Sequence, residues 1–497
     1  MSTQTPQTEQ NIGHEQRQVR LNKMKQLQDK GINPYPHIFR PTATAASLSE
    51  KYKDLANDTQ TDDQVLVAGR IRAIRNSGMF IDIFDATGKI QIYTSMDHAS
   101  DTLKEMLSFL DIGDVIGVTG TVRRTKRGEL SVNASAIDML SKSLLPLPEK
   151  FHGLTDTDTK YRQRYLDMIM NPSTTEALIK RSKIITAIRS LLLDQGLLEV
   201  ETPILQPIKG GATAKPFTTH HNTLDMDLFL RVAPELYLKR LIIGGMPGVF
   251  EIGRNFRNEG MSTRHNPEFT MMEVYRVYND YTDMMTLFEQ IVETACLAVN
   301  GTTEIEIDGK KINLKGPFPR KTMAELVKQY TGIDFLAITS DEEARKITDG
   351  LGIAVTKDMD WGHCMAMVFE EKCEEHLIQP THVIDHPKSM SPLTKEHRNE
   401  PRLVERFETF INTWEVCNAY SELTNPVDQR ARFEEQVKAR EAGDEEADMM
   451  DDDFVTALEH GMPPTGGLGV GIDRLVMVLT SILSIRDIIA FPTMRKK

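Results

Sequence analysis

The chain has 497 residues, with 40% hydrophobic and 26% charged residues and a formal net charge of −13. This length predicts two to four structural units, and no apolar run reaches the roughly 18 residues that a membrane span requires. The acidic balance excludes a protein that coats nucleic acid nonspecifically, because such binding needs a basic surface.

The N-terminal residues and the cysteines further limit the class of protein. The N-terminal residues lack the basic and apolar regions of a secretion signal, so we expect a cytoplasmic location. The cysteines are too few and too widely spaced for a disulfide framework or a paired zinc site, which predicts reduced structural thiols. They are Cys296, Cys364, Cys373 and Cys417.

Residues 1–60 are predicted to form a polar, basic helical extension. Within it, residues 14–30 mix basic and apolar side chains without a helix breaker before Gly31. The cations of this helix either contact a phosphate backbone or form an ordinary solvated face. They are Arg17, Arg20, Lys23, Lys25 and Lys30.

Residues 61–143 are predicted to form a small antiparallel barrel or sandwich, since short alternating runs are separated by Gly, Asp and Asn. One face is apolar: Met79, Ile81 and Ile83, continued after a turn by Ile90 and Ile92. The opposite face mixes aromatic, amide and charged side chains, namely Phe80, Asp82, Phe84, Lys89, Gln91 and Tyr93.

Basic residues enrich the same segment, and aromatics beside a basic groove are how proteins hold single-stranded nucleic acid. An oligonucleotide-binding barrel therefore fits. The alternative is that Phe80 and Phe84 are core residues of a sheet covered on both faces. The basic residues are Arg70, Arg72, Arg123, Arg124, Lys126 and Arg127.

Residues 144–165, with their prolines and a glycine, are predicted to be a linker, and residues 166–497 a large α+β domain. Residues 175–196 have helical apolar spacing and end at Gly196. A strand follows and closes at Pro203.

Residues 249–275 predict two strands joined by a polar loop. Counting by twos places Phe269, Met271, Glu273 and Tyr275 on one face of the second strand. A ring, carboxylates and guanidinium groups on one surface suit the adenine and phosphates of ATP, although a surface hairpin with ordinary ion pairs has the same composition. The loop carries Arg257, Glu259, Arg264 and His265.

Residues 406–423 place Glu408, Glu415 and Glu422 at intervals of seven, either as one helical stripe or, as the aromatic and β-branched content favours, on strands. Magnesium prefers a few carboxylates together with phosphate oxygens and water. We therefore predict Glu408 and Glu415 as Mg²⁺ ligands. The alternative is that they pair with Arg402 or Arg406.

Residues 466–471 are glycine-rich and lead through Asp473 and Arg474 into an apolar helix over residues 475–483. Glycines allow close backbone approach, and a helix start directs Arg474 toward an anion. A glycine-rich loop before a helix is also a common packing joint.

These segments resemble, in order, the three signatures of class II aminoacyl-tRNA synthetases, and residues 256–269 look like the second signature of the lysyl enzymes. The resemblance covers the chain from Val65 to Pro492. It implies an oligonucleotide-binding barrel followed by a catalytic domain built on an antiparallel sheet with flanking helices. It also implies a homodimer with Pro203 at its interface.

The resemblance further implies an ATP-dependent enzyme that forms lysyl-adenylate and transfers lysine to the 3′-terminal adenosine of tRNA(Lys). Arg257 and Arg474 would be catalytic, with Arg257 on the lysine carboxylate and α-phosphate and Arg474 over adenine opposite Phe269. ATP binding would involve Arg257, Glu259, His265, Asn266, Phe269, Glu415 and Arg474.

A lysine pocket should supply carboxylates for both ammonium groups. Similarity to lysyl-enzyme segments implies Gly211 and Glu235 at the α-amino end and Glu422 with Tyr275 at the ε-ammonium. Tyr420 would pack on the methylenes, Asn418 would bind the carboxylate and Glu273 would form an acidic wall. On the barrel we expect Phe80, Gln91 and Glu129 to contact the anticodon.

Three other functions fit parts of the sequence. An RNA-binding paralogue without catalysis would not need Arg257, Glu273, Glu415 and Arg474. An aspartyl or asparaginyl enzyme shares the architecture but would want cationic or amide donors in the pocket. The third function is that of a paralogue that makes dinucleotide signals or attaches lysine to a protein. The protein-modifying relatives lack the barrel, so the barrel predicted here argues against that function.

Overall fold

The computed structural model describes residues 6–148, 154–443, 447 and 449–496. These fall into two compact units, Met1–Gly153 and Leu154–Lys497, which are described separately. Of the predicted extension, residues 1–5 lie outside the described part, as do residues 149–153 of the predicted linker. The boundaries 1–60, 61–143, 144–165 and 166–497 remain predictions.

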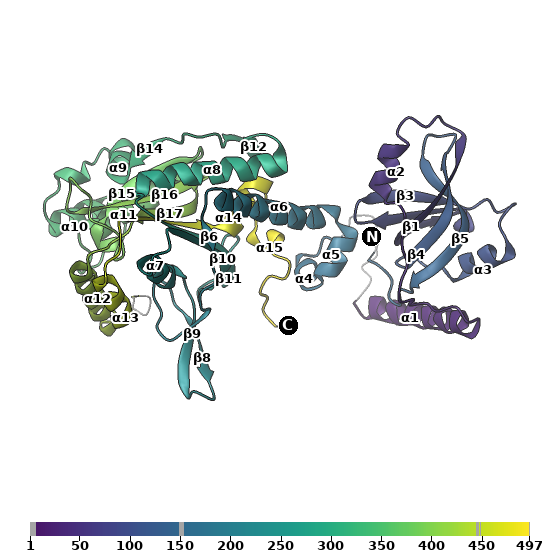
Figure 1. Cartoon of the computed structure of the whole chain (residues 1–497), viewed down its shortest axis with the longest axis horizontal. Coiled ribbons are helices and arrows are strands. Elements are labelled where there is room, and N and C mark those ends of the chain that lie inside the picture. Colours follow the sequence, from purple (N-terminus) through teal and green to yellow (C-terminus); the bar gives the residue numbers. More distant parts are fainter. Residues whose placement is uncertain (1–5, 149–153, 444–446, 448, 497) are drawn as a thin grey trace. The chain divides into compact units, whose positions relative to one another are not determined.

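The first unit is a closed five-stranded barrel in the order β1-β2-β3-β5-β4, which confirms the barrel over the sandwich (Figure 1). Its strands are β1 Thr59–Arg75, β2 Phe80–Asp85, β3 Gly88–Tyr93, β4 Val115–Arg124 and β5 Leu130–Ser141. Its helices are α1 Pro6–Asp29, α2 Ala45–Lys51 and α3 Asp101–Phe109.

The faces of the barrel follow the predicted alternation. Ile81, Ile83 and Ile92 are fully buried and Ile90 nearly so, whereas Phe80 and Phe84 are only partly covered. The aromatic strand is therefore not covered on both sides, and the core interpretation of Phe80 and Phe84 is wrong.

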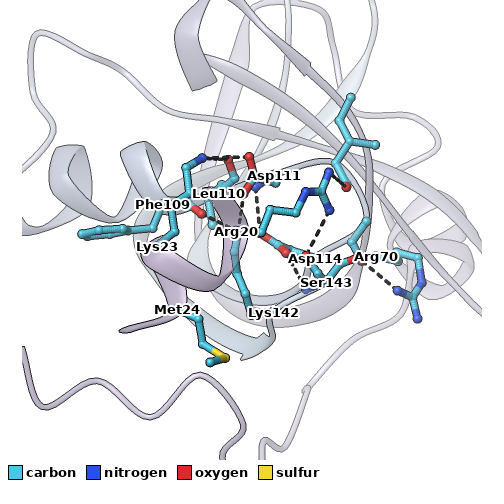
Figure 2. A network of polar contacts seen from close by, with 12 residues as sticks. Arg20, Lys23, Met24, Arg70, Phe109, Leu110, Asp111, Asp114, Lys142 and Ser143 are labelled. Carbon is cyan, nitrogen blue, oxygen red and sulfur yellow. Dashed lines mark hydrogen bonds and ion pairs between the residues drawn. The ribbon is translucent and has the colours of Figure 1, made fainter. Parts of the chain in front are cut away.

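Helix α1 begins at Pro6, upstream of the predicted start at His14, and several of its cations serve the fold. Arg20 donates to the carbonyls of Ile112, Ser143 and Leu145, and Lys23 pairs with Asp111 at 2.7 Å (Figure 2). Lys30 pairs with Glu105 at 2.5 Å. Arg17 and Lys25 are exposed.

The second unit is built on an eight-stranded sheet in the order β14-β15-β16-β17-β18-β11-β10-β6, mostly antiparallel. Its strands are β6 Leu198–Glu199, β10 Gly248–Phe256, β11 Glu268–Val277, β14 Arg320–Thr322, β15 Thr381–Pro387, β16 Leu403–Ile411, β17 Trp414–Ser421 and β18 Thr465–Gly471. Smaller sheets contain β7 Leu205–Gln206, β8 Phe217–His221 and β9 Met226–Leu230, and β12 Glu304–Ile307 and β13 Lys310–Asn313.

Helices flank the large sheet, with α6 and α8 along one face (Figure 1). The helices are α4 Thr157–Arg162, α5 Arg164–Met170, α6 Pro172–Asp194, α7 Glu235–Ile243, α8 Tyr281–Asn300, α9 Met323–Thr331, α10 Asp341–Gly350, α11 Trp361–Lys372, α12 Pro426–Glu441, α13 Asp452–Glu459, α14 Ile472–Thr480 and α15 Ile485–Ile488. The α+β expectation is confirmed. No described helix is long and apolar enough to cross a membrane.

Alternation along three central strands separates the core from the opposite face. Met272 and Val274 of β11, Ala419 of β17, and Leu468 and Val470 of β18 are buried in the core beneath α8. Their neighbours in sequence project from the other face of the sheet. Polar side chains on these strands are thus collected on one surface.

One local expectation is confirmed and another needs correction. Glu408 and Glu415 lie on strands β16 and β17, as the aromatic and β-branched content predicted. Residues 466–471 are not a loop but part of the central strand β18, and the helix that follows begins at Ile472. Glycine removes the side-chain alternation by which a strand is recognised.

Candidate active site

The face of the sheet opposite α8 bears a cavity of about 390 Å³. Every ATP, lysine and metal residue predicted in the second unit lines it, although their individual roles remain predictions. These residues are Gly211, Glu235, Arg257, Glu259, His265, Asn266, Phe269, Glu273, Tyr275, Glu408, Glu415, Asn418, Tyr420, Glu422 and Arg474.

Arg257 lies just beyond β10, and its guanidinium carbon is 5.2 Å from the ring centroid of Phe269 on β11. Burial lowers the pKa of Arg257, while Glu259 and Glu415 oppose that shift. Its Nε is buried without a hydrogen-bond partner among the described residues. A guanidinium in this state remains charged and favours a bound anion.

Arg474 sits in the first turn of α14. Its Nη1 donates to the backbone oxygen of Glu415 at 2.8 Å and to Oε2 of the same residue at 2.9 Å, while Nη2 lies 3.0 Å from His265 Nε2. Burial, and then the charge of Arg474, lowers the pKa of His265. The neighbouring Asp473 accepts from Thr270 N at 2.8 Å and pairs with Arg181, so the helix start is fixed to β11.

Glu408 and Glu415 form a carboxylate pair near the arginines. Glu408 pairs with Arg406 at 2.7 Å, as one alternative anticipated, and Glu415 pairs with Arg474 rather than with Arg402 or Arg406. Burial, with Glu370, Glu408 and Glu415, raises the pKa of Glu374 to about 7. This end of the cavity thus brings carboxylates and guanidinium groups together.

The other end of the cavity is acidic and deeply buried. Glu235, Glu273 and Glu422 are 4%, 4% and 1% exposed. Tyr275 donates to Glu273 Oε2 at 2.9 Å and Tyr420 to Glu235 Oε1 at 2.7 Å. Tyr275 also lies near Glu422, whose charge helps to raise the pKa of the tyrosine. Glu422 Oε1 is buried without a hydrogen-bond partner among the described residues.

Burial controls the ionisation of this acidic end. It raises the pKa of Glu273 to about 8, with Glu235 adding to the shift, and it raises the pKa of Glu422 as well, against the pull of Lys239. A cation that enters the cavity would therefore stabilise the ionised form of these carboxyl groups.

Two glycines make room for these acids. A Cβ on Gly467 would overlap Glu422 Oε1 and come within 2.9 Å of Tyr275 Cε1. Gly211 has φ +90°, and a Cβ there would lie 3.1 Å from the Cβ of Glu235. Gly467 of β18 thus leaves the space that the side chains of Glu422 and Tyr275 occupy.

Three further side chains around the cavity have contacts that the sequence did not predict. Arg406 Nε donates to Asn418 Oδ1 at 3.0 Å, so the amide nitrogen of Asn418 is the atom that can serve a carboxylate. Arg264 lies 5.3 Å from a Trp414 ring centroid. Lys239, buried behind the acids, has no role among the sequence predictions, although its i,i+4 spacing from Glu235 is a signal for pairing.

The predicted anticodon residues lie on β2, β3 and the segment before β5, which pair in the barrel. The ring centroids of Phe80 and Tyr93 are 5.4 Å apart, and the guanidinium of Arg123 is 4.4 Å from Tyr93. Gln91 Oε1 accepts from Ser131 Oγ at 2.9 Å. Glu129 pairs with Lys89 at 2.6 Å.

The basic residues of the barrel divide into two kinds. The guanidinium carbon of Arg72 lies 5.2 Å from the Phe84 ring centroid, as Arg123 lies near Tyr93, so both join the aromatic face. Arg70 and Arg124 instead donate to backbone carbonyls within the unit.

Comparison with known proteins gives two family matches. The model described as tRNA synthetases class II (D, K and N) matches residues 156–495, and the model of the OB-fold nucleic acid binding domain matches residues 65–140.

Curated relatives match almost the whole chain. A lysine–tRNA ligase of Sinorhizobium medicae is 57% identical over 481 residues, 97% of each chain. That of Rhizobium leguminosarum bv. trifolii is 54% identical over 491 residues, 99% of each chain. That of Pelotomaculum thermopropionicum is 52% identical over 483 residues, 96% of this chain and 94% of its own.

Proposed function

Since the chain belongs to the class II tRNA synthetases of the aspartate, lysine and asparagine group, we propose that it is the lysine–tRNA ligase of that group. It forms lysyl-adenylate from lysine and ATP and transfers lysine to the 3′-terminal adenosine of tRNA(Lys). The observation that carries the choice of amino acid is the buried set of Glu235, Glu273 and Glu422 at one end of the cavity. Such a wall attracts a dication and repels aspartate.

The first step needs no covalent bond to the protein. An oxygen of the lysine carboxylate attacks the α-phosphorus of ATP, and the bond to pyrophosphate breaks. Arg257 and Arg474 supply fixed positive charge where the phosphoryl group gains negative charge. In the second step a ribose hydroxyl of the tRNA attacks the carbonyl carbon and AMP leaves.

The substrate roles follow the two ends of the cavity. Glu422 and Glu273 receive the ε-ammonium, and Glu235 with the Gly211 backbone receives the α-amino group. Tyr420 packs on the methylenes, and Asn418 with Arg257 binds the carboxylate. Holding both reactants in this geometry removes much of the entropic barrier.

ATP occupies the arginine end. Phe269 and Arg474 stack on adenine, Glu259 accepts from its amine, and His265 and Asn266 place the triphosphate beside Glu415. The guanidinium carbon of Arg257 lies 5.2 Å from the Phe269 ring centroid, so both groups are on the same wall of the cavity.

Magnesium fits the remaining donors. Glu408 and Glu415 offer carboxylate oxygens, and together with burial, the larger cause, their charges help to raise the pKa of nearby Glu374 to about 7. No described group of three or more His, Cys, Asp or Glu side chains is placed to hold a metal alone. Two carboxylates plus phosphate oxygens suit Mg²⁺, which neutralises phosphate charge when bound.

The barrel binds the tRNA anticodon through Phe80, Gln91 and Glu129, and the enzyme works as a cytoplasmic homodimer. Support for the anticodon role is the aromatic and basic face of the barrel, where Arg123 lies beside Tyr93. Support for the dimer is a set of exposed apolar side chains around Pro203.

The test is ATP–pyrophosphate exchange with each amino acid in turn. Lysine should support exchange, and aspartate and asparagine should not. Arg257→Ala should fold but lose at least about a hundredfold in exchange rate, the usual scale for removing one preorganised donor to a developing anion. Wild-type exchange by this variant, or exchange driven by aspartate, would overturn the proposal.

A further inference from the structure

A buried lysine lies directly behind the acidic end of the cavity. Lys239 is 0% exposed and projects from α7 between two of the three acids. Its Nζ lies 2.7 Å from Glu235 Oε1 and pairs with Glu422 Oε2. The same ammonium lies 5.6 Å from the ring centroid of Tyr420.

Lys239 joins elements far apart in the sequence. Glu235 opens α7, whereas Glu422 follows β17 and bridges to Thr394. Among the described residues, the cavity lining includes both acids but not Lys239. The lysine therefore acts on the cavity through the carboxylates that it holds.

We propose that Lys239 is a positioning and specificity-determining residue, which fixes the carboxyl groups of Glu235 and Glu422 from behind the cavity so that the pocket matches a dicationic amino acid. The inference rests on the proposed function. It adds a residue that does not touch the substrate but decides where both carboxylates point.

The burial of Lys239 supports this role. Three buried carboxyl groups line the cavity, and the ammonium of Lys239 contacts two of them. Without Lys239, Glu235 and Glu422 would lose the group that fixes their positions, and repulsion between carboxylates in this water-poor site would be opposed less.

The Lys239 ammonium also determines which carboxyl oxygens of Glu235 and Glu422 are occupied. Its contact with Glu235 uses Oε1, which Tyr420 also bonds, and its contact with Glu422 uses Oε2. The buried Oε1 of Glu422 is left without a hydrogen-bond partner among the described residues. That oxygen is the natural acceptor for the incoming ε-ammonium.

A second buried lysine offers a matched control. Lys142, also with 0% of its side chain exposed, lies 2.8 Å from Asp114 and 2.5 Å from Asp111 in the barrel unit (Figure 2). It closes a network with Lys23, Arg20 and Ser143 that ties α1 to the barrel. It thus resembles Lys239 in burial and partners, but lies in the unit without the amino-acid cavity.

The experiment compares Lys239→Met with Lys142→Met and wild type in lysine-dependent ATP–pyrophosphate exchange without tRNA. Lys239→Met should raise the KM for lysine at least tenfold while the KM for ATP and kcat stay within about twofold. It should also lose at least tenfold in preference for lysine over 6-hydroxynorleucine, whose hydroxyl replaces the ε-ammonium. Lys142→Met should keep both the KM for lysine and this preference.

The outcomes are distinct. No lysine-dependent exchange by wild type would overturn the proposed function itself. Normal wild-type exchange with an unchanged lysine KM and preference in Lys239→Met would overturn only the role of Lys239. Equal losses in Lys142→Met would overturn it too, since the effect would then be general destabilisation.

If Lys239→Met does not fold, a crystal structure of the wild-type protein with bound lysine gives the same decision. Lys239 Nζ should keep its contacts with Glu235 Oε1 and Glu422 Oε2, and the ε-ammonium of the substrate should contact Glu422 Oε1. Loss of either Lys239 contact in the complex, or an ε-ammonium bound away from Glu422, would overturn the positioning role.

Discussion

At the scale of single residues, Glu273 links lysine binding to pH. Its pKa is about 8 because the carboxyl is buried and lies near Glu235. In the empty enzyme it is mostly protonated at pH 7, while a bound ammonium favours its ionised form. The same shift makes the empty enzyme less stable as pH rises from about 4.5 to about 8, because the folded state holds this proton more tightly than the unfolded state.

We therefore expect the KM for lysine to fall roughly fivefold between pH 7 and pH 8 and to level off above that range, by proton linkage at one site. Exchange kinetics at saturating ATP measure it. Glu273→Gln cannot ionise and should give a flat profile over the same interval. An unchanged slope in that variant would assign the titration to another group.

The residues that line the cavity were more predictable from the sequence than the contacts among them. Alternation along a strand is local, so the sequence alone assigns Phe269, Glu273 and Tyr275 to one face. The pairing of Lys239 with Glu422 depends on α7 packing beside the end of β17, which no local pattern contains. The hydrogen bond from the hydroxyl of Tyr275 to Glu273, two residues away on its own strand, is a contact of the same kind that the sequence did not predict.

At the scale of elements, the β16–β17 turn places two non-glycine residues in left-handed backbone conformations. Asn412 has φ +53° and Thr413 φ +65°. Asparagine tolerates this region, but a β-branched threonine is strained there. The turn nevertheless docks firmly, since its two amides donate to Ile378 and Leu377.

Thr413→Gly should raise the free energy of unfolding of the second unit by up to about 1 kcal/mol, because relief of strain exceeds the entropy that glycine adds to the unfolded chain. Urea denaturation followed by circular dichroism measures it. Asn412→Gly is the matched change and should gain less. A loss of stability in Thr413→Gly would show that the threonine side chain makes compensating contacts.

The aromatic face of the barrel allows a prediction about tRNA binding. Phe80→Ala removes a ring beside Tyr93, and one stacked base is worth about 1–3 kcal/mol. The KM for tRNA in aminoacylation should rise about tenfold, while lysine-dependent exchange stays unchanged. Ser135→Ala, at an exposed position of β5, should leave both reactions as in wild type. A lowered exchange rate in Phe80→Ala would contradict a role confined to tRNA.

At the scale of the whole molecule, exposed apolar side chains mark an association surface near Pro203. Leu193, Leu198, Ile204 and Leu205 are 48%, 47%, 44% and 48% exposed. Leu198 lies on β6, an outermost strand of the large sheet. Exposed large apolar side chains this close together in sequence are consistent with the proposed dimer interface.

Leu198→Asp should shift the protein from dimer toward monomer, because a carboxylate would be buried unpaired at the interface. Sedimentation equilibrium measures the mass. Leu224→Asp, at a position 64% exposed beside the β8–β9 turn, should leave the mass unchanged. A monomeric wild-type protein would contradict the proposed dimer.

The space that Gly467 leaves for Glu422 has a consequence for how the gene tolerates change. Every amino-acid replacement at this codon adds at least a methyl group, so even alanine should displace the Glu422 carboxyl group and lower lysine use while most of the fold survives. In a saturation library glycine alone should therefore give full activity, and a suppressor at codon 422 should be aspartate, which shortens the side chain and keeps the carboxylate.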